Sequence, residues 1–450
     1  MKLDVGYQAS PLWRPGEPDF ENNFNTARHR FSALLRRFEK DPKYEQDYRK
    51  AMNKYTDNNY VREVKDWTEE DDKQYFLTHH GVYKNLKDKE DGKLHIVFNA
   101  AEQCRNRSKG RKCLNDALYP GPSIVAPLTS VLLRFCEREV AWAADIGAHF
   151  SRVRVSDQDA RYLRFIWVEK GSKHWKIMEK IRLPFGLNCA PYIAVSTTRR
   201  AVVESGADPS TIKAVEDNMY MDDYLGSSAS VEEGIKEAKA VSTAVKYGDF
   251  HLDGWVSNSQ KFLNLIRENQ QEPTKQLVKI LGILWDTRKD TLSYRFDELE
   301  PITFTLAGIL SKVASVYDPL GVAAPLTVKA KWKLREMSQR GVKWKDLVVG
   351  GDRQWWEKWF VKVKELEQFE KPRCLFPNED QIKETTMVGF GDASEEAGAT
   401  SIYLRHLYEN GSVQVKFVKG ATKLAPKTRI SIPKLELNAP LLTARVMQDV

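Results

Sequence analysis

Residues 218–226, NMYMDDYLG, place two adjacent carboxylates, Asp222 and Asp223, between aromatic and apolar neighbours. Successive side chains on a straight strand point to opposite faces, so both acids can serve one site only where the chain bends. The pattern therefore predicts a strand, a tight turn that carries the acids, and a returning strand. Adjacent acids among apolar side chains repel each other and lose hydration, which favours a compensating cation. A solvent-exposed turn with two acids is the alternative that this stretch alone leaves open.

A third carboxylate follows a second apolar stretch. Residues 140–144, VAWAA, have the composition of a buried strand, and Asp145 comes directly after them. A strand end fixes such an acid in place, while the loop beyond it leaves the carboxylate accessible. Asp145, Asp222 and Asp223 would together form an all-oxygen site, which suits Mg²⁺. Two such ions could activate an attacking hydroxyl and stabilise a leaving pyrophosphate. For Asp145 alone, a helix N-cap or a turn acid is the alternative.

Several further motifs occur in an order that resembles a known family. Residues 183–191, LPFGLNCAP, resemble the segment between the two acidic motifs of reverse transcriptases, and residues 281–286, LGILWD, resemble the segment that grips the primer. Residues 315–321, SVYDPLG, and 432–437, IPKLEL, are more particular to one group. Together the motifs resemble the reverse transcriptase region of a Bel/Pao-type LTR retrotransposon polyprotein, with a truncated ribonuclease H-like domain.

The resemblance implies a fold of the α+β class. We expect a right-hand polymerase with fingers, palm and thumb, a helical connection and a partial ribonuclease H-like α/β domain. The expected boundaries are an N-terminal helical lead and start of the fingers at 1–90, fingers and palm at 91–265, primer grip, thumb and connection at 266–375, and the truncated ribonuclease H-like domain at 376–450.

The activity implied by the resemblance is that of an RNA-directed DNA polymerase, a nucleotidyltransferase of a transposable element. Its partners would be an RNA template, a DNA primer and deoxynucleoside triphosphates. Asp145, Asp222 and Asp223 are the implied catalytic residues and metal ligands, with Asp223 in a supporting role. They would hold two Mg²⁺ ions, for which Mn²⁺ could substitute.

Other positions match residues that contact nucleotide or nucleic acid in the family. Phe150 corresponds to the aromatic ring that leaves no room for a ribose 2′-hydroxyl, and a core phenylalanine is its alternative. Gly186 would let the backbone approach the incoming base pair. The other implied nucleotide-binding residues are His95, Ile146, Phe185, Tyr220 and Met221. The implied primer or template residues are Leu281, Gly282, Trp285, Arg105 and Arg107, although residues 105–112 also have the composition of a solvated basic loop.

Three positions depart from the family pattern. His95 stands where related enzymes carry an arginine that holds the triphosphate, and Asn99 replaces an acid. A mostly neutral imidazole should grip phosphate more weakly than a guanidinium. Gly254 stands where a basic residue is expected, so no lysine is identified as general acid for pyrophosphate. These departures leave a second hypothesis open, a catalytically decayed retroelement remnant that binds nucleic acid or acts as a scaffold.

A second, incomplete site is expected near the end of the sequence. Asp392 and Glu436 resemble the first two carboxylates of a ribonuclease H domain. Two-metal hydrolysis in that fold needs further acids from later elements. Because the sequence ends at Val450, we expect no ribonuclease H activity from this chain and interpret it as a fragment of a longer polyprotein.

Composition is consistent with this interpretation without proving it. Lys and Arg number 70 against 62 Asp and Glu, so the net charge is +8, which is compatible with a polyanionic partner. The five cysteines include no CxxC pair, which favours reduced intracellular thiols over disulfides or zinc. We find no membrane-spanning run and no cleavable signal. The expected location is therefore intracellular, in a cytoplasmic retroelement particle, with the nucleus as an alternative.

Overall fold

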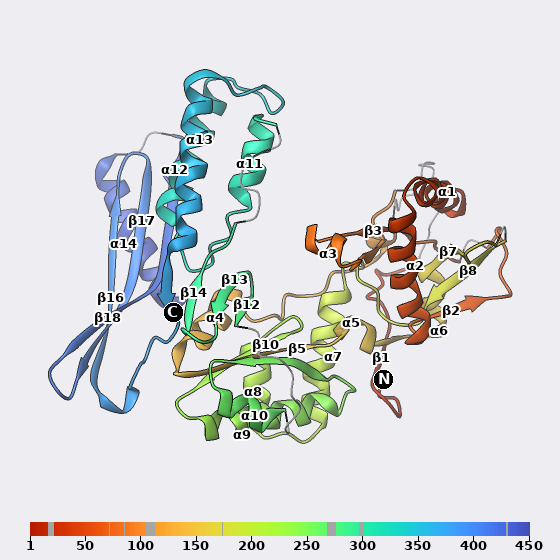
Figure 1. The fold of residues 1–450 in the computed structure, drawn as a ribbon, viewed down its shortest axis with the longest axis horizontal. Helices are drawn as coiled ribbons and strands as arrows, with labels where there is room; N and C mark the ends of the chain where they lie inside the picture. Colours follow the sequence, from red (N-terminus) through yellow and green to blue (C-terminus); the bar gives the residue numbers. More distant parts are fainter. Residues whose placement is uncertain are drawn as a thin grey trace. The chain divides into compact units, whose positions relative to one another are not determined.

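The structure is a computed structural model that describes the chain except for residues 17–21, 72, 85, 104–112, 173, 268–275, 297–300, 302 and 429–430. Its internal contacts define two compact units (Figure 1). Unit 1 comprises residues 1–125, 146–215 and 240–252, and unit 2 comprises residues 126–145, 216–239 and 253–450. Each unit is therefore assembled from segments that are distant in the sequence.

Unit 1 begins with two amphipathic helices, α1 (Phe24–Lys40) and α2 (Pro42–Asp57). Phe31, Leu34 and Phe38 recur at helical spacing and are buried, a pattern typical of an amphipathic helix. Asp41 accepts a hydrogen bond from the Tyr44 backbone N–H at 3.0 Å and so caps the start of α2. The short helices of this unit are α3 (Leu86–Glu90), α5 (His149–Arg152) and α6 (Asp157–Ala160), and its longest later helix is α7 (Ala190–Glu204).

Three small sheets complete unit 1. The largest has the strand order β2–β8–β7, in which both neighbouring pairs are antiparallel. The strands are β1 (Gln8–Ala9) parallel to β6 (Arg154–Val155), β3 (Thr78–Val82) antiparallel to β4 (His95–Asn99), and β2 (Val61–Val64), β7 (Arg164–Val168) and β8 (Trp175–Lys180). Buried aromatic rings from the helices and the sheets pack together here, with Tyr48 stacked on Trp167 at 6.0 Å between ring centroids.

The first sheet of unit 2 has the order β11–β5–β10–β9 and carries the predicted carboxylates. Its strands are β5 (Val140–Ile146), β9 (Met219–Tyr220), β10 (Asp223–Ser228) and β11 (Leu252–Ser257), with α4 (Leu128–Glu137) and α10 (Gln260–Ile266) in the same unit. Helices α8 (Pro209–Asn218) and α9 (Val231–Lys246) continue from one unit into the other.

The remainder of unit 2 contains two more sheets and four helices. The second sheet has the order β12–β13–β14–β15, and the third has the order β16–β17–β18. The strands are β12 (Leu277–Ile280), β13 (Ile283–Asp286), β14 (Thr291–Ser293), β15 (Glu370–Pro372), β16 (Ile382–Ala393), β17 (Ala397–Tyr408) and β18 (Val413–Leu424). The helices are α11 (Leu306–Ala314), α12 (Ala324–Gln339), α13 (Gly350–Glu365) and α14 (Ile432–Gln448).

The helices α11–α13 enclose an aromatic core of their own. Trp356 is fully buried and Trp359 is 4% exposed, and both pack with Phe360. By contrast, Trp344 is 59% exposed. Burial makes Trp356 and Trp359 structural residues.

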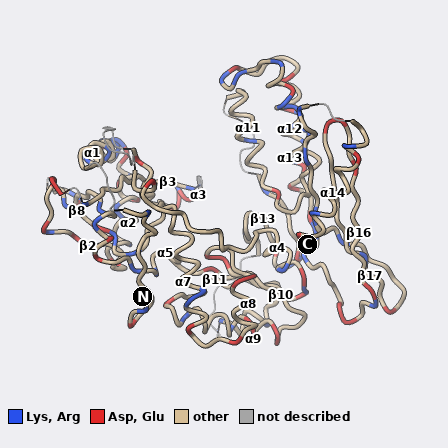
Figure 2. Tube along the Cα trace, turned by 180° about the vertical axis from the view of Figure 1, so that it is seen from behind, with Lys and Arg blue, Asp and Glu red and all other residues tan. Residues whose placement is uncertain are grey.

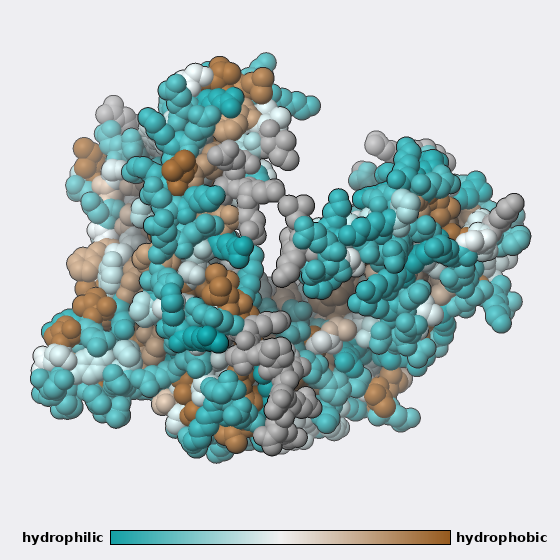
Figure 3. All heavy atoms as spheres, viewed as in Figure 1, coloured by the Kyte–Doolittle hydropathy of each residue, from teal (hydrophilic) through white to brown (hydrophobic). Residues whose placement is uncertain are grey.

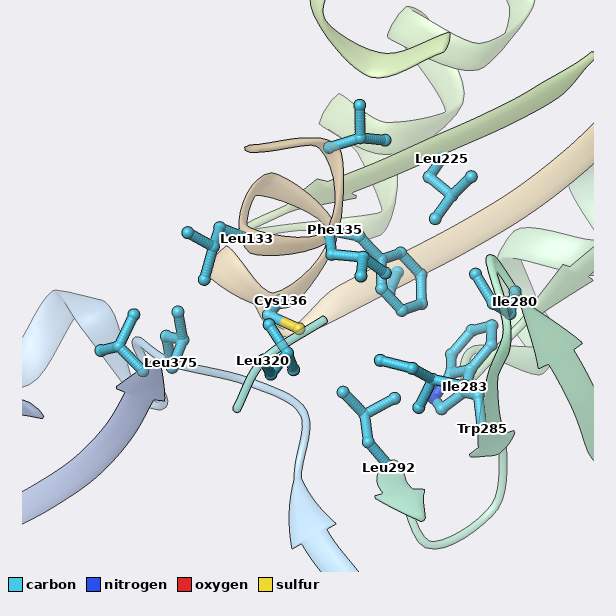
Figure 4. Packing of buried hydrophobic residues seen from close by; sticks show 14 of the residues in the cluster. Leu133, Phe135, Cys136, Leu225, Ile280, Ile283, Trp285, Leu292, Leu320 and Leu375 are labelled. Atoms are coloured by element: carbon cyan, nitrogen blue, oxygen red, sulfur yellow. The ribbon is translucent and has the colours of Figure 1, made fainter. Parts of the chain in front are cut away.

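One hydrophobic core joins the three sheets of unit 2 (Figure 4). Phe135 and Cys136 of α4 meet Trp285 and Leu292 of the second sheet, and the cluster continues to Val446 of α14. Trp285 packs edge-on against Phe135 with ring centroids 4.9 Å apart. Strand β5, which carries the predicted acid, therefore follows a helix that is anchored in this core.

A fully buried arginine lies beside this core. Arg373 has no exposed surface, and its guanidinium forms a bidentate pair with Asp290 at 2.7 and 2.8 Å. The other N–H groups donate to the carbonyls of Phe135, Arg138 and Glu139 at 2.7–2.8 Å. Since the last carbonyls of a helix have no partners within it, Arg373 satisfies the end of α4 and fixes the turn into β5.

Charged groups of both signs are interspersed in both units (Figure 2). The visible face likewise shows hydrophobic residues in small groups among hydrophilic ones (Figure 3). Among the described helices, none combines the length and apolar character that crossing a bilayer requires.

Replacing Arg373 with lysine should destabilise unit 2 by about 3–5 kcal/mol, because one ammonium cannot satisfy the partly buried Asp290 carboxylate and three carbonyls. The measurement is chemical denaturation of the purified chain. Arg353→Lys is the matched control, since Arg353 is 52% exposed in its side chain and pairs with Glu357 on the same helix. That control should change stability by less than about 0.5 kcal/mol. Equal effects of the two substitutions would contradict the structural role of Arg373.

Candidate active site

The register of two antiparallel strands brings the acidic motifs together. Strand β10 pairs with β5 over six residues, from Ser228 opposite Val140 to Asp223 opposite Asp145. Directly opposed residues on antiparallel strands project from the same face, with Cβ atoms about 4.5–5.5 Å apart. Asp145 and Asp223 therefore lie side by side at one end of the sheet, on the same face.

The predicted strand, turn and returning strand are present, with one difference. Strands β9 and β10 form a hairpin in which Tyr220 pairs with Asp223. Met221 and Asp222 make the two-residue turn, and Met221 has a φ of 58°, in the left-handed region that a tight hairpin of this kind requires. Asp222 is thus in the turn as predicted, whereas Asp223 already belongs to the returning strand.

The three acids act on one another electrostatically. The pKa of Asp223 rises to about 6, first because the carboxyl is partly buried and then because Asp222 and Asp145 are negatively charged. Asp145 itself is solvent-exposed, and Asp222 and Asp223 are partly exposed. The strand end therefore carries three neighbouring carboxyl groups, and the ionisation of Asp223 is disfavoured.

A glycine lies directly beside one of these acids. Gly254 on β11 has a φ of 65°, and a Cβ built there would lie 2.9 Å from Asp145 Oδ1. A larger residue would therefore suffer backbone strain and push against the carboxylate. The sequence pattern leads us to expect a basic residue here, and the structure gives a physical reason for glycine.

The three carboxylates of Asp145, Asp222 and Asp223 suit a hard divalent cation, but their side chains do not converge on one point. In the described part of the chain, no group of three or more His, Cys, Asp or Glu side chains is placed so that it could hold a metal ion as it stands. Carboxylate oxygens are the ligands that Mg²⁺ prefers, and the pKa of Asp223 is raised by burial and then by the negative charge of Asp222 and Asp145, which a cation would neutralise. The chemistry of the cluster therefore fits the cation that the sequence implied.

Within unit 1, Phe150, the ring expected to exclude a 2′-hydroxyl, packs against Phe185, another predicted nucleotide-binding residue. Phe150 of α5 is 7% exposed, and its ring packs on that of Phe185 at 4.2 Å between centroids. Phe185 is 55% exposed. Gly186 has a φ of 109°, and a Cβ there would lie 2.2 Å from the Phe98 carbonyl oxygen, so this position requires glycine. The structure thus brings Phe150 and Phe185 together next to a close backbone approach.

Asn115, which no sequence motif identifies, holds the loop that contains Gly186. Its side chain donates to the Gly186 carbonyl at 3.0 Å and accepts from the Asn188 backbone N–H at 3.0 Å. The Asn188 side chain in turn donates to the Asn115 carbonyl at 3.1 Å. A single asparagine that lies some seventy residues earlier in the sequence gives no signal of this contact. The tight turn at Gly186 indicates only that some polar side chain should bind its backbone.

His95 lies exposed on β4, as a residue that meets a ligand should. Partial burial lowers the pKa of His95, and the nearby Lys84 and Lys54 lower it further. Its imidazole is therefore mostly neutral at pH 7, and the two lysines supply positive charge beside it that the nearby Asp88 partly offsets. Ile146, by contrast, is 1% exposed and belongs to the core.

The residues assigned to primer and template fall in different environments. Leu281 and Gly282 form the turn between β12 and β13, with φ values of 42° and 89°. Trp285 is fully buried and donates to Asp290 at 2.9 Å, so its ring is a core residue that no primer could reach in this structure. Arg105 and Arg107 lie outside the described residues.

The two acids of the partial ribonuclease H site are both exposed. Asp392 lies near the end of β16, and Glu436 lies in the first turns of α14. The Cβ position of Gly391 faces Thr443 of α14, so the neighbouring Asp392 projects toward the other face of the sheet. Asp392 therefore projects from the face of the sheet opposite to α14, the helix that carries Glu436.

Asp223→Asn should stabilise the protein at pH 7.5 by about 1–2 kcal/mol and leave it unchanged at pH 3.5. The folded state holds the proton of Asp223 up to a pKa of about 6, but the unfolded state releases it near 3.8. The stability that the protonated Asp223 carboxyl contributes is thus fully present below pH 3.8 and is lost as the pH rises through about 6. Chemical denaturation at a series of pH values tests this, and an equal effect at both pH values would refute it.

Comparisons with known proteins identify a family model and solved structures that the chain resembles. Residues 305–450 match a family model described as the Pao retrotransposon-like RNaseH-like domain. The match begins before α11, so it includes the helices α11–α13 as well as β16–β18 and α14. No curated protein matches the sequence.

Solved structures of foamy viral protease-reverse transcriptase resemble the whole chain. A form denoted dRH, in complex with double-stranded DNA, superposes with a TM-score of 0.56 at 14% identity over 91% of this chain. Complexes with an RNA/DNA hybrid and with double-stranded DNA give TM-scores of 0.54 and 0.53, at 12% and 14% identity, each over 99% of this chain. This chain spans 61%, 50% and 78% of the length of those proteins, respectively.

At such low identity the likeness establishes the fold, which is the predicted α+β right-hand polymerase with a ribonuclease H-like part at its C-terminal end. The predicted resemblance to the reverse transcriptase region of a Bel/Pao-type retrotransposon is therefore confirmed, with the Pao-type family model accounting for residues 305–450 and the reverse transcriptase fold for the chain as a whole.

Proposed function

We propose that this chain is an RNA-directed DNA polymerase of a retrotransposon, with Asp145, Asp222 and Asp223 as its catalytic carboxylates. The observation that carries the proposal is the β5–β10 register, which sets Asp145 opposite Asp223 beside the hairpin turn that holds Asp222. A structural role does not account for this arrangement, because Asp223 is partly buried beside two further carboxylates that disfavour its ionisation. A role in binding a cation does account for it.

Two Mg²⁺ ions are the cofactor we propose, held by these three carboxylates, and Mn²⁺ would substitute. When bound, they would activate the primer 3′-hydroxyl and neutralise charge on the triphosphate. Strand β5 holds Asp145 at its end, and Gly254 leaves the Asp145 carboxylate room to turn toward a ligand. In unit 1, His95 with Lys84 and Lys54 would contact the triphosphate, and Phe150 would exclude a 2′-hydroxyl.

The proposed partners are an RNA template, a DNA primer and deoxynucleoside triphosphates. The foamy viral proteins of similar fold were solved with double-stranded DNA or an RNA/DNA hybrid, which supports a nucleic-acid ligand for this fold. A net charge of +8 favours the same kind of ligand.

The deciding experiment is primer extension by the purified chain on an RNA template with Mg²⁺. We expect the natural sequence to incorporate deoxynucleotides. Asp222→Asn should lower the rate of extension by about 10³-fold or more, because a neutral amide cannot replace a metal-binding carboxylate. Asp208→Asn is the control, since Asp208 caps α8 by accepting from Ser210 and Thr211 and belongs to no acid cluster. Nucleic-acid binding without any extension would instead favour the decayed remnant.

Phe150→Ala should admit ribonucleotides while leaving the use of deoxynucleotides largely intact, because the ring would act only by occupying space. The ratio of kcat/KM for the two sugars should fall by about 10-fold or more, which corresponds to roughly 1.4 kcal/mol. Phe185→Ala removes the ring that packs on Phe150 and should give a smaller change. An unchanged ratio in a folded variant would make Phe150 a core residue only.

Gly254→Ala should lower kcat for extension by about 10-fold or more, because the added methyl group displaces the Asp145 carboxylate. Gly411→Ala is the matched control, since Gly411 has a φ of 81° but nothing within 4 Å of its Cβ position. Both substitutions should cost about 1 kcal/mol of stability through backbone strain, and only the first should affect kcat. Equal kcat values in the two variants would show that Gly254 serves only the backbone conformation of β11.

A further inference from the structure

A cavity of about 760 Å³ lies against the β16–β18 sheet, away from the candidate active site. The Cβ positions of Gly389 and Gly391 would lie 2.7 and 2.2 Å from side-chain atoms of Thr443, so these positions face α14. Because side chains alternate along a strand, Phe390 and Asp392 project to the opposite face, where they line the cavity. The far wall is formed by Val322, Ala324, Pro325 and Phe369.

Three aromatic rings from neighbouring strands form a row across this face. Phe390 of β16 lies 6.0 Å from Tyr403 of β17, and Tyr403 lies 5.5 Å from Phe417 of β18, between ring centroids. Phe390 is 61% exposed, an unusual degree for a phenylalanine in a sheet. Exposed aromatic rings on a sheet can stack against planar ligands such as nucleobases.

The cavity also contains a buried cation. Lys371 of β15 lines it, is 8% exposed, and has its Nζ 5.7 Å from the centroid of the Phe417 ring. Within the described chain, this Nζ has no hydrogen-bond partner. Burial and the nearby positive Lys416 both lower the pKa of Lys371. A buried amine without a partner is costly, and an anion reached by rotation of the flexible side chain would favour its charged form and relieve that cost.

The opposite end of the cavity carries a negative charge. Asp392 pairs with Ala399, whereas Phe417, beside Lys371, pairs with Tyr403, four residues further along β17. Four residues of strand span roughly 13 Å. The cavity therefore presents a cation at one end, aromatic rings between, and a carboxylate that can accept a hydrogen bond at the other end.

We propose that this cavity binds a nucleoside monophosphate whose base carries an exocyclic amine. The phosphate lies near Lys371, the base stacks on the row of Phe390, Tyr403 and Phe417, and the amine donates to Asp392. Small-molecule sites commonly have volumes of about 300–1,000 Å³, so the cavity has a suitable size. The inference does not depend on the polymerase activity proposed above.

The test is calorimetric titration of AMP into the full chain in the presence of EDTA, which removes divalent cations from the candidate active site. We expect saturable binding that weakens at least 10-fold in Lys371→Met and in Phe390→Ala, and is unchanged in Asp222→Asn. The matched controls are Lys423→Met and Val415→Ala, because both residues lie exposed on β18 and neither lines the cavity. Adenosine, which lacks the phosphate, should bind the natural chain about as weakly as AMP binds Lys371→Met.

IMP tests the carboxylate end, because it carries an oxygen in place of the exocyclic amine. IMP should bind several-fold more weakly than AMP, and Asp392→Asn should abolish that preference. Phe390 is exposed, so Phe390→Ala keeps the test valid even if Lys371→Met does not fold. Absence of AMP binding, or binding that none of the cavity substitutions changes, would overturn the proposal. Binding of an oligonucleotide, but not of AMP, that depends on Phe390 would also overturn it, in favour of a strand as occupant.

Discussion

The pairing of β5 with β10 is the constraint on which the rest of the candidate site depends. Six residue pairs align Asp145 with Asp223, and a slip of one residue would move Asp145 to the opposite face. The buried partners behind this register prevent such a slip, because Trp142 stacks on Phe262 and leaves space only for glycine at positions 226 and 234. Core packing on one side of the sheet therefore fixes the acids at its end.

The start of β5 is held as firmly as its end. The buried guanidinium of Arg373 satisfies the last carbonyls of α4 and binds Asp290, which in turn accepts from Trp285. Residues more than two hundred positions apart thus form one polar network beside the hydrophobic core. Because every partner is buried or partly buried, breaking one of these bonds would leave an unsatisfied group, and such groups are expensive.

The carboxylate cluster works against folding, while these networks support it. Burial and then the like charges of Asp222 and Asp145 raise the pKa of Asp223, and the left-handed backbone at Met221 adds local strain. Functional sites commonly concentrate such unfavourable features, which the surrounding structure compensates. In the proposed enzyme, bound cations would remove much of this cost, so catalysis and the stability of the hairpin would be linked.

The amino-acid sequence by itself determined the local elements and the identity of the acids. The apolar run before Asp145 and the NMYMDDYLG stretch predict their strands and turn because alternation and turn chemistry are local properties. The spacing of Phe31, Leu34 and Phe38 likewise predicts α1. Only the tertiary structure decided that Asp223 is the residue opposite Asp145, that Trp285 is core and that Gly254 faces a carboxylate. These outcomes depend on contacts between strands distant in the sequence, which no local pattern encodes, because register and burial are set by the packing of the whole unit.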